Sequence, residues 1–174
     1  MSQYKKTPSH IAKKVKLMIV YRIGHKNYIT HFTASGRDGR WVSDGRMVIY
    51  CAATIELAFL ENMVRRQGAG FNSDVKTMLI EIPDNLGMEI ISAANLHTGW
   101  RNHRDYSFCQ PIGNKWYDEL KTPILRVPSV IIPESNNFVI NTNHPDFNKI
   151  KIAGITNLVP DERIEDILKN YKKR

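Results

Sequence analysis

Short apolar runs, rich in Val, Ile and Tyr and separated by turn residues, recur along the chain, and this pattern is typical of β-strands. Five runs predict strands and a sixth is a possible last strand: residues 16–23, 46–52, 76–82, 124–132, 137–142 and 149–153. Gly, Asp, Asn and Pro separate them, as in GRDGR, SDGR and PESNN. The pattern therefore predicts a sheet of short strands.

Three segments have a helical pattern instead: residues 55–67, 111–121 and 161–173. Thr54 is a suitable N-cap for the first, and Gly68 a suitable stop. The last has acidic residues first and lysines last, as the helix dipole favours. Because strands and helices do not alternate regularly, a doubly wound parallel sheet is disfavoured. We predict one α+β domain over residues 1–174, with a mixed, mainly antiparallel β core and peripheral helices.

Composition adds a preference for partners. The 174 residues are 42% hydrophobic and 24% charged, which is ordinary for a soluble globular protein, and no apolar run approaches the roughly 18 residues that span a bilayer. The net charge of +8 favours an anionic partner such as a nucleic acid, a phosphorylated small molecule or an acidic protein. Residues 1–16 are basic and predict an arm or a short helix. Cys51 and Cys109 lie far apart without metal-site spacing, which favours a reducing cytoplasm.

Glu61 lies in an unexpected place on the first predicted helix. Leu57, Leu60 and Val64 fall on one face, and Glu61 falls among them. A buried carboxylate is costly unless it is paired. One interpretation places Glu61 at the edge of the apolar stripe, paired with Arg65 one turn later. The other is that this face borders a cleft into which Glu61 points, where it could stabilise a cation or act as a base.

Further segments hold candidate binding residues. Arg22 lies in the first predicted strand, either on the solvated face or directed at a phosphate, which its planar fork suits. The loop 35–46 is rich in Arg and Gly, like a phosphate-binding loop, although it matches neither common phosphate motif. Its Trp41 is either a core residue or a surface for base stacking. Ser129 lacks a nucleophile-elbow motif and could instead fix a neighbouring side chain by a hydrogen bond. The stretch 96–108 mixes His, Arg and aromatics, as nucleic-acid faces often do.

Arg22, Glu61 and Ser129 together suggest a family. The chain resembles the RES domain, found in toxins of RES–Xre toxin–antitoxin pairs. The resemblance rests on these stretches, in order: VYRI (20–23), GRW with a following glycine (39–45), VIYCAATIELAFLE (48–61), GNKWYDE (113–119), LRVPSVIIPESNNFVIN (125–141), HPDF (144–147) and PDERI (160–164). One difference is Thr142, where the family often has Pro after the Asn.

The resemblance implies a fold related to ADP-ribosyltransferases and an activity on NAD+. Such enzymes degrade NAD+ by hydrolysis or phosphorolysis, or transfer ADP-ribose to a protein. The positions that match the active site are Arg22, Arg40, Tyr50, Glu61 and Ser129. On this resemblance, Glu61 would stabilise the cation that forms on the ribose when nicotinamide leaves, as in glycoside hydrolysis.

The other residues would bind or orient. Arg22 and Arg40 would hold the pyrophosphate, Tyr50 would stack on the nicotinamide with help from Tyr21, and Ser129 would orient Glu61 or an arginine. NAD+ would be a substrate, and neither a cofactor nor a metal is required. The resemblance also implies a homodimer within a larger complex, with an Xre-type antitoxin as partner. We expect a cytoplasmic protein with neither a membrane nor a nucleic acid as partner. The competing interpretation from charge alone is a nucleic-acid-binding module without catalysis, or a basic face that docks an acidic protein.

Overall fold

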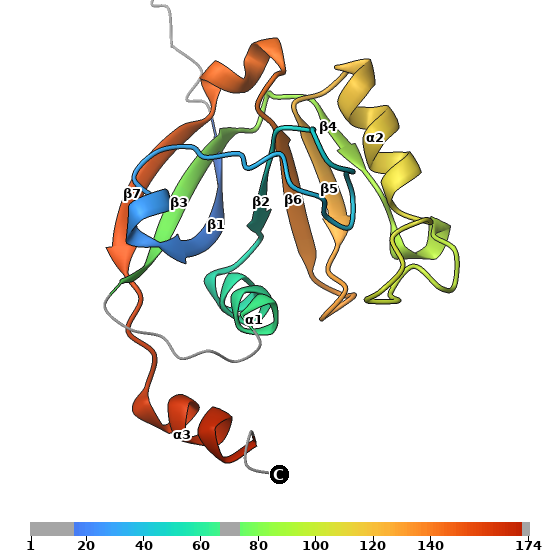
Figure 1. Ribbon diagram of the computed structural model, residues 1–174. Coiled ribbons are helices and arrows are strands. Elements are labelled where there is room, and N and C mark those ends of the chain that lie inside the picture. Colours follow the sequence, from blue (N-terminus) through green and yellow to red (C-terminus); the bar gives the residue numbers. More distant parts are fainter. Residues whose placement is uncertain (1–15, 67–73, 172–174) are drawn as a thin grey trace, which may run out of the picture.

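The computed structural model describes residues 16–66 and 74–171 (Figure 1). The predicted stop at Gly68 and nearly all of the predicted basic arm lie outside these ranges. The strands are β1 (Leu17–His25), β2 (Val48–Ala52), β3 (Val75–Pro83), β4 (Met88–Ile90), β5 (Ile124–Pro128), β6 (Asn136–Asn141) and β7 (Lys151–Asn157). The α-helices are α1 (Ile55–Arg65), α2 (Gln110–Glu119) and α3 (Glu162–Tyr171), and short 3-10 helices cover Lys26–Tyr28, Ala93–Asn95 and Pro145–Lys149.

The seven strands form one sheet in the order β4-β5-β6-β2-β1-β3-β7. Every pair is antiparallel except β4 and β5, which run parallel. The predicted α+β class with a mainly antiparallel sheet is therefore confirmed. β1 and β2 meet at a single residue pair, Tyr21 with Ala52, whereas β1 and β3 pair along their whole length. The sheet is thus weakly joined between β1 and β2, and its two halves turn away from each other there (Figure 1).

The clearest differences between the predicted and the observed strands concern β4, β5 and β7. β4 has only three residues, too few to produce a periodic signal. β7 begins and ends later than predicted, at Lys151 and Asn157. β5 stops at Pro128 instead of continuing to residue 132, because the chain turns there and the Ser129 N–H donates to the Ser135 carbonyl at 2.9 Å.

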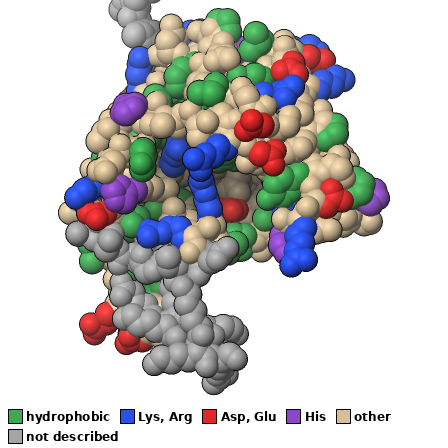
Figure 2. Space-filling model, viewed as in Figure 1, with side chains coloured by type: hydrophobic (Ala, Val, Ile, Leu, Met, Phe, Trp, Pro, Cys, Tyr) green, Lys and Arg blue, Asp and Glu red, His purple; other side chains and the backbone are tan. Residues whose placement is uncertain are grey.

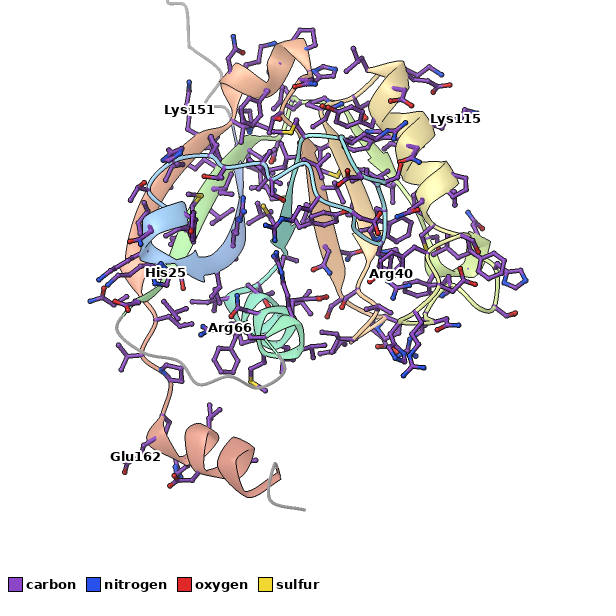
Figure 3. All side chains as sticks on the ribbon, viewed as in Figure 1. His25, Arg40, Arg66, Lys115, Lys151 and Glu162 are labelled. Atoms are coloured by element: carbon purple, nitrogen blue, oxygen red, sulfur yellow. The ribbon has the colours of Figure 1, made fainter. Side chains whose placement is uncertain are left out.

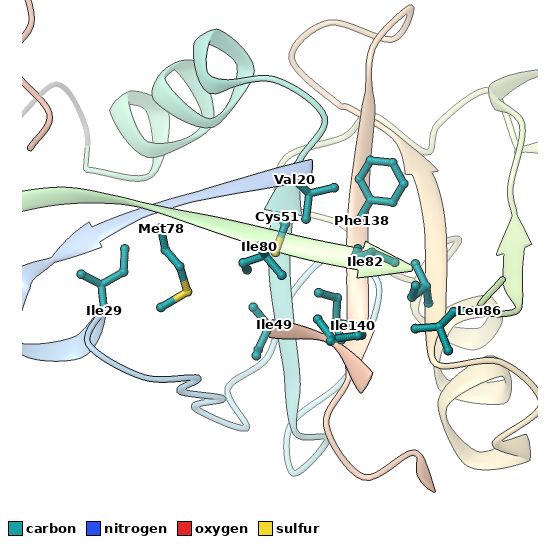
Figure 4. Packing of buried hydrophobic residues seen from close by; sticks show 12 residues of the cluster. Val20, Ile29, Ile49, Cys51, Met78, Ile80, Ile82, Leu86, Phe138 and Ile140 are labelled. Atoms are coloured by element: carbon teal, nitrogen blue, oxygen red, sulfur yellow. The ribbon is translucent and has the colours of Figure 1, made fainter. Parts of the chain in front are cut away.

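The main core lies between the two halves of the sheet. Its largest cluster contains Val20 and Met78 from one half with Ile49, Cys51 and Ile140 from the other (Figure 4). The alternation of side chains along each strand puts this cluster on one face, so the residues between them point to the opposite face. There a second cluster, which includes Trp41, Trp100 and Trp116, packs beneath α2.

α1 begins as predicted, because the Thr54 hydroxyl accepts from the Leu57 N–H at 3.2 Å. Leu57 and Ala58 are buried against the sheet, but Val64 is 61% exposed, so the predicted apolar stripe is wrong at its last position. The cluster beneath α1 includes Leu57, Ala58, Phe59 and Met63 from the helix, and Val64 is not part of it. Glu61 therefore sits near the limit of the packed face rather than in its middle.

One face of α2 fastens the loop that precedes β2. The residues of this face, spaced three and four apart, form what we call the α2 seam: Gln110, Gly113, Asn114 and Tyr117. Asn114 exchanges two hydrogen bonds with Ser43, accepting from its N–H and donating to its hydroxyl, each at 2.9 Å. The Met47 N–H donates to the Tyr117 hydroxyl at 3.1 Å. The loop with the GRW stretch is therefore fixed to a helix.

Candidate active site

Glu61 is held by two side chains from distant parts of the chain. Its Oε1 accepts from the Ser129 hydroxyl at 2.8 Å and from Nδ2 of Asn137 at 2.6 Å. Within the described residues, Oε2 has no hydrogen-bond partner, and Arg65 makes no ion pair with Glu61. The interpretation of Glu61 as a simple helix-surface pair with Arg65 is therefore wrong.

Ser129 is buried where β5 ends, and its environment determines what its hydroxyl does. Its Oγ accepts from the backbone N–H groups of Ile131 and Ile132 at 3.1 and 3.2 Å. A hydroxyl has two acceptor lone pairs and one proton. With both lone pairs occupied, the proton is directed to Glu61.

The sheet register gathers polar side chains around a small residue. Tyr21 of β1 pairs with Ala52 of β2, which pairs in turn with Asn137 of β6. Directly paired residues share a face, and Tyr50, two residues before Ala52, points to that face as well. Because the side chain of Ala52 is only a methyl group, it leaves space on this face of the sheet between the larger side chains that surround it.

Figure 2 shows a hollow in the face that carries α1, with Lys and Arg side chains along its edge and an acidic side chain at its floor. Arg65 and Arg66 lie at the end of α1, about one turn after Glu61 in the sequence, and Figure 3 labels Arg66. A hollow of this charge suits an anionic ligand that also carries a cationic group.

Tyr50 is nearly covered by the preceding loop. Burial raises the pKa of Tyr50 to about 12, although backbone N–H groups of Trp41 and Val42 near its oxygen act in the opposite direction. A Cβ placed on Gly39 would lie 2.6 Å from the Tyr50 hydroxyl oxygen. Only glycine at position 39 leaves room for this hydroxyl, which keeps its proton at neutral pH.

Arg40 braces two loops. Its guanidinium donates to the carbonyls of Trp100 and Asn102 and lies over the ring of Tyr106, 4.9 Å from the ring centroid (Figure 3). These two carbonyls use two of its five N–H donors. Burial raises the pKa of the Cys109 thiol, and the nearby Arg40 guanidinium opposes this effect. Trp41, beside it, is buried in the core, so the interpretation of Trp41 as a stacking surface is wrong.

Arg22 is half-buried within β1 and not at a strand end. Its Nη1 donates to the Thr33 carbonyl at 2.8 Å. Burial lowers the pKa of Arg22, the neighbouring Cys51 thiol opposes this effect, and the positive charge of Arg65 adds to it. Alternation along β1 puts Arg22 and Tyr21 on opposite faces. Within the described residues, Arg22 makes no hydrogen bond or ion pair with Glu61.

The structure brings some of the predicted residues together and leaves others apart. Glu61 and Ser129 are joined by a direct hydrogen bond, and Tyr21 and Tyr50 lie on the sheet face that carries Asn137. Arg40 and Arg22 are tied by their own bonds to neighbouring loops. Sequence reasoning missed Asn137, since an asparagine in NFVINT has no distinguishing pattern.

Other features of the described residues are less informative. A cavity of about 480 Å³ lies between α2 and the β4 edge, away from Glu61. Its Lys115 and Lys121 both pair with Glu119, at 4.0 and 2.9 Å. No group of three His, Cys, Asp or Glu in the described part of the chain could hold a metal ion. No helix there is long and apolar enough to cross a membrane.

Comparison with known proteins decides the family. The family model described as RES domain matches residues 19–165. The chain belongs to the RES domain family. The RES match includes every predicted site residue and confirms the resemblance seen in the sequence.

Several curated RES relatives are similar over most of their length. The "Prs ADP-ribosylating toxin" of Sphingobium sp. strain YBL2 is 33% identical over 128 residues, which cover 72% of this chain and 80% of the relative. The "Toxin Res" of Yersinia enterocolitica is 31% identical over 134 residues, 75% of this chain and 88% of the relative. The "Toxin Res" of Pseudomonas putida is 29% identical over 149 residues, which cover 84% of this chain and 99% of the relative.

Proposed function

We propose that this RES protein is the toxin of a bacterial toxin–antitoxin pair and that it cleaves the nicotinamide–ribose bond of NAD+. The observation that carries the proposal is the carboxylate of Glu61, with one oxygen held by Ser129 and Asn137 and the other without a partner in the described residues. The names of the relatives support a toxin, and one of those names specifies ADP-ribosylation.

The chemistry needs a negative charge beside the ribose. When the bond between ribose and nicotinamide breaks, its electron pair leaves with nicotinamide, and positive charge develops on the sugar as an oxocarbenium ion. Oε2 of Glu61 would face that carbon. Because the two donors already hold Oε1, the carboxylate does not have to reorient as the charge develops, which is the condition for effective electrostatic stabilisation.

The remaining residues would bind the rest of NAD+. Arg22 and Arg40 would contact the pyrophosphate through charge-assisted hydrogen bonds, Arg40 with donors that its loop carbonyls leave unused. Tyr50 and Tyr21 would line the nicotinamide side. The phenol of Tyr50 is protonated at neutral pH, so it would present an uncharged aromatic surface to the cationic nicotinamide.

The acceptor of the ADP-ribose distinguishes two candidate activities. Water or phosphate as acceptor would make the protein an NAD+ glycohydrolase or phosphorylase and deplete cellular NAD+. A protein side chain as acceptor would make it an ADP-ribosyltransferase, and the name of the Sphingobium relative favours this second candidate. Both share the cation-forming step and the same demand on Glu61.

The proposal includes the biological setting. A toxin that consumes NAD+ in the cytoplasm requires an inhibitor in the same cell, so we propose an Xre-type antitoxin as partner, acting on a homodimer of this chain. No metal and no resident cofactor enter the proposed reaction, in which NAD+ is the substrate.

The test is NAD+ consumption by the purified chain, with and without phosphate and with identification of the products. Glu61→Gln keeps an oxygen that can accept from Ser129 and Asn137 but removes the charge, so turnover should fall about 100- to 1,000-fold while the fold is preserved. Glu56→Gln is the matched control, because Glu56 is an exposed carboxylate on the same helix. Equal turnover by Glu61→Gln and wild type would contradict the proposal.

A further inference from the structure

Asn137 lies in β6 between two neighbouring strands, paired with Ala52 of β2 and Val127 of β5. Neither neighbour carries a polar side chain. Asn137 nonetheless directs its amide nitrogen at Oε1 of Glu61, at 2.6 Å. The shortest hydrogen bond that Glu61 receives thus comes from a strand and not from Ser129, whose bond is 2.8 Å long.

The orientation of the Asn137 amide is informative. Its Oδ1 is buried and, within the described residues, has no hydrogen-bond partner. Such an atom is unfavourable, so something must favour the orientation that leaves it unsatisfied. A carboxylate accepts hydrogen bonds and cannot donate them when ionised, so the reverse orientation would bring two acceptor oxygens together. The contact with the Glu61 carboxylate therefore disfavours the flipped amide.

The hydrogen bonds from Ser129 and Asn137 together determine the orientation of the Glu61 carboxylate. Both converge on Oε1, and the two N–H groups that occupy the lone pairs of the Ser129 oxygen leave its proton directed at Glu61. One bond alone would leave the carboxylate free to rotate about that contact. Two bonds from different elements, the end of β5 and the middle of β6, fix the plane of the carboxylate and with it the direction of Oε2.

We propose that Asn137 is a positioning residue that fixes the orientation of the Glu61 carboxylate and aims its Oε2 at the ribose of the substrate. This inference rests on the proposed function, because it assigns Asn137 to the same site and the same cation-forming step. Asn137 acts through Glu61 and not through contact with NAD+, so its loss should lower kcat more than it raises KM.

The experiment compares Asn137→Ala and Asn137→Asp with wild type, measuring kcat and KM for NAD+ between pH 4 and pH 9. Asn137→Ala removes the donor, and kcat should fall about 10- to 100-fold with KM nearly unchanged. The acid-side midpoint of the activity profile should move to higher pH, because the ionised carboxylate loses a hydrogen bond that favours it. Asn137→Asp is nearly isosteric but sets a second carboxylate beside Glu61, so it should move the midpoint further.

Asn136→Ala is the matched control, since Asn136 is the preceding residue of β6 and its side chain points to the other face. It should leave kcat and the pH midpoint unchanged. Unchanged kcat and pH midpoint in a folded Asn137→Ala would overturn the inference. A fall in kcat with an unmoved midpoint would do the same, because a purely structural role predicts it. Should Asn137→Ala not fold, the Asp variant provides the same two readouts.

A second measurement separates this inference from the proposed function. The titration of the Glu61 carboxyl carbon by NMR in selectively labelled protein requires no turnover. If wild type consumes no NAD+ while the Asn137 variants move the Glu61 titration midpoint to higher pH, the proposed reaction fails and the pairing of Asn137 with Glu61 holds. If wild type consumes NAD+ and the titration midpoint is the same in all variants, the assignment of Asn137 fails alone.

Discussion

Gly113 in the α2 seam allows the closest approach between a helix and the loop that carries the GRW stretch. A methyl group added there would overlap the carbonyl oxygen of Trp41 and lie 2.7 Å from its carbonyl carbon. The obstacle is backbone and not the end of a flexible side chain. Gly113→Ala therefore requires α2 and the loop to separate, which would also strain the paired hydrogen bonds between Asn114 and Ser43.

Two effects of opposite sign determine the size of the change. Alanine is favoured over glycine within a helix by about 0.5–1 kcal/mol. Overpacking of a well-packed site costs about 1–3 kcal/mol and sometimes more, and each strained neutral hydrogen bond adds about 0.5–1.5 kcal/mol. The loss should therefore exceed the gain, with a net destabilisation of about 2 kcal/mol. For a chain of this size that corresponds to a fall in Tm of about 4–8 °C.

Thermal unfolding followed by circular dichroism measures this effect. Gly154→Ala in β7 is the matched control, because a Cβ there has no neighbouring atom within 4 Å, and its Tm should stay within about 2 °C of wild type. A Tm for Gly113→Ala equal to or above that of wild type would refute the close docking of α2 on Trp41. It would also remove the explanation of how the loop with Arg40 is held.

Three further predictions concern the site and its surroundings. Gly39→Ala should displace the Tyr50 ring, because the new Cβ would lie 2.6 Å from its hydroxyl, and should lower unfolding stability by about 1–3 kcal/mol. Arg22→Ala should raise KM for NAD+ about 10-fold or more in steady-state assays. Burial raises the pKa of Cys51 to about 12 from its ordinary 9.0. The free energy of unfolding at alkaline pH should therefore depend on this thiol, and denaturant titrations at several pH values measure it.

The sign of the Cys51 effect follows from linkage. The folded state holds the thiol proton to a higher pH than the unfolded state does. Its contribution to stability is therefore complete below about pH 9 and is lost as the pH rises toward about 12. Cys51→Ala should flatten this decline, and an equally steep decline would contradict it. Normal NAD+ affinity in Arg22→Ala would count against the role of Arg22 in binding the pyrophosphate. An unchanged unfolding stability of Gly39→Ala would count against the tight contact between Gly39 and Tyr50.

Local signals in the sequence predicted much of the fold. Thr54 marked the start of α1 because capping depends on one hydroxyl and the residues that follow. Proline, glycine and asparagine marked the turns for the same reason. The strand order could not be predicted, because the single pair that joins Tyr21 to Ala52 depends on how the two halves of the sheet pack.

The site was predictable only in part, for a related reason. Glu61 stood out because a carboxylate interrupts an apolar helix face, and the resemblance linked it to Ser129. Asn137 gave no such signal, since its amide matters only through the register that sets β6 beside β2. Val64 was assigned to the wrong environment because helical periodicity does not reveal where the sheet beneath a helix ends.

The central claim is that Glu61 supplies the charge that makes loss of nicotinamide possible. Release of nicotinamide from NAD+ by purified wild type and Glu61→Gln, quantified by chromatography at equal concentrations of folded protein, tests this claim most directly. We expect steady release by wild type and release at least about 100-fold slower from the variant. Comparable release from both proteins, or none from wild type in water, phosphate or cell extract, would contradict the account.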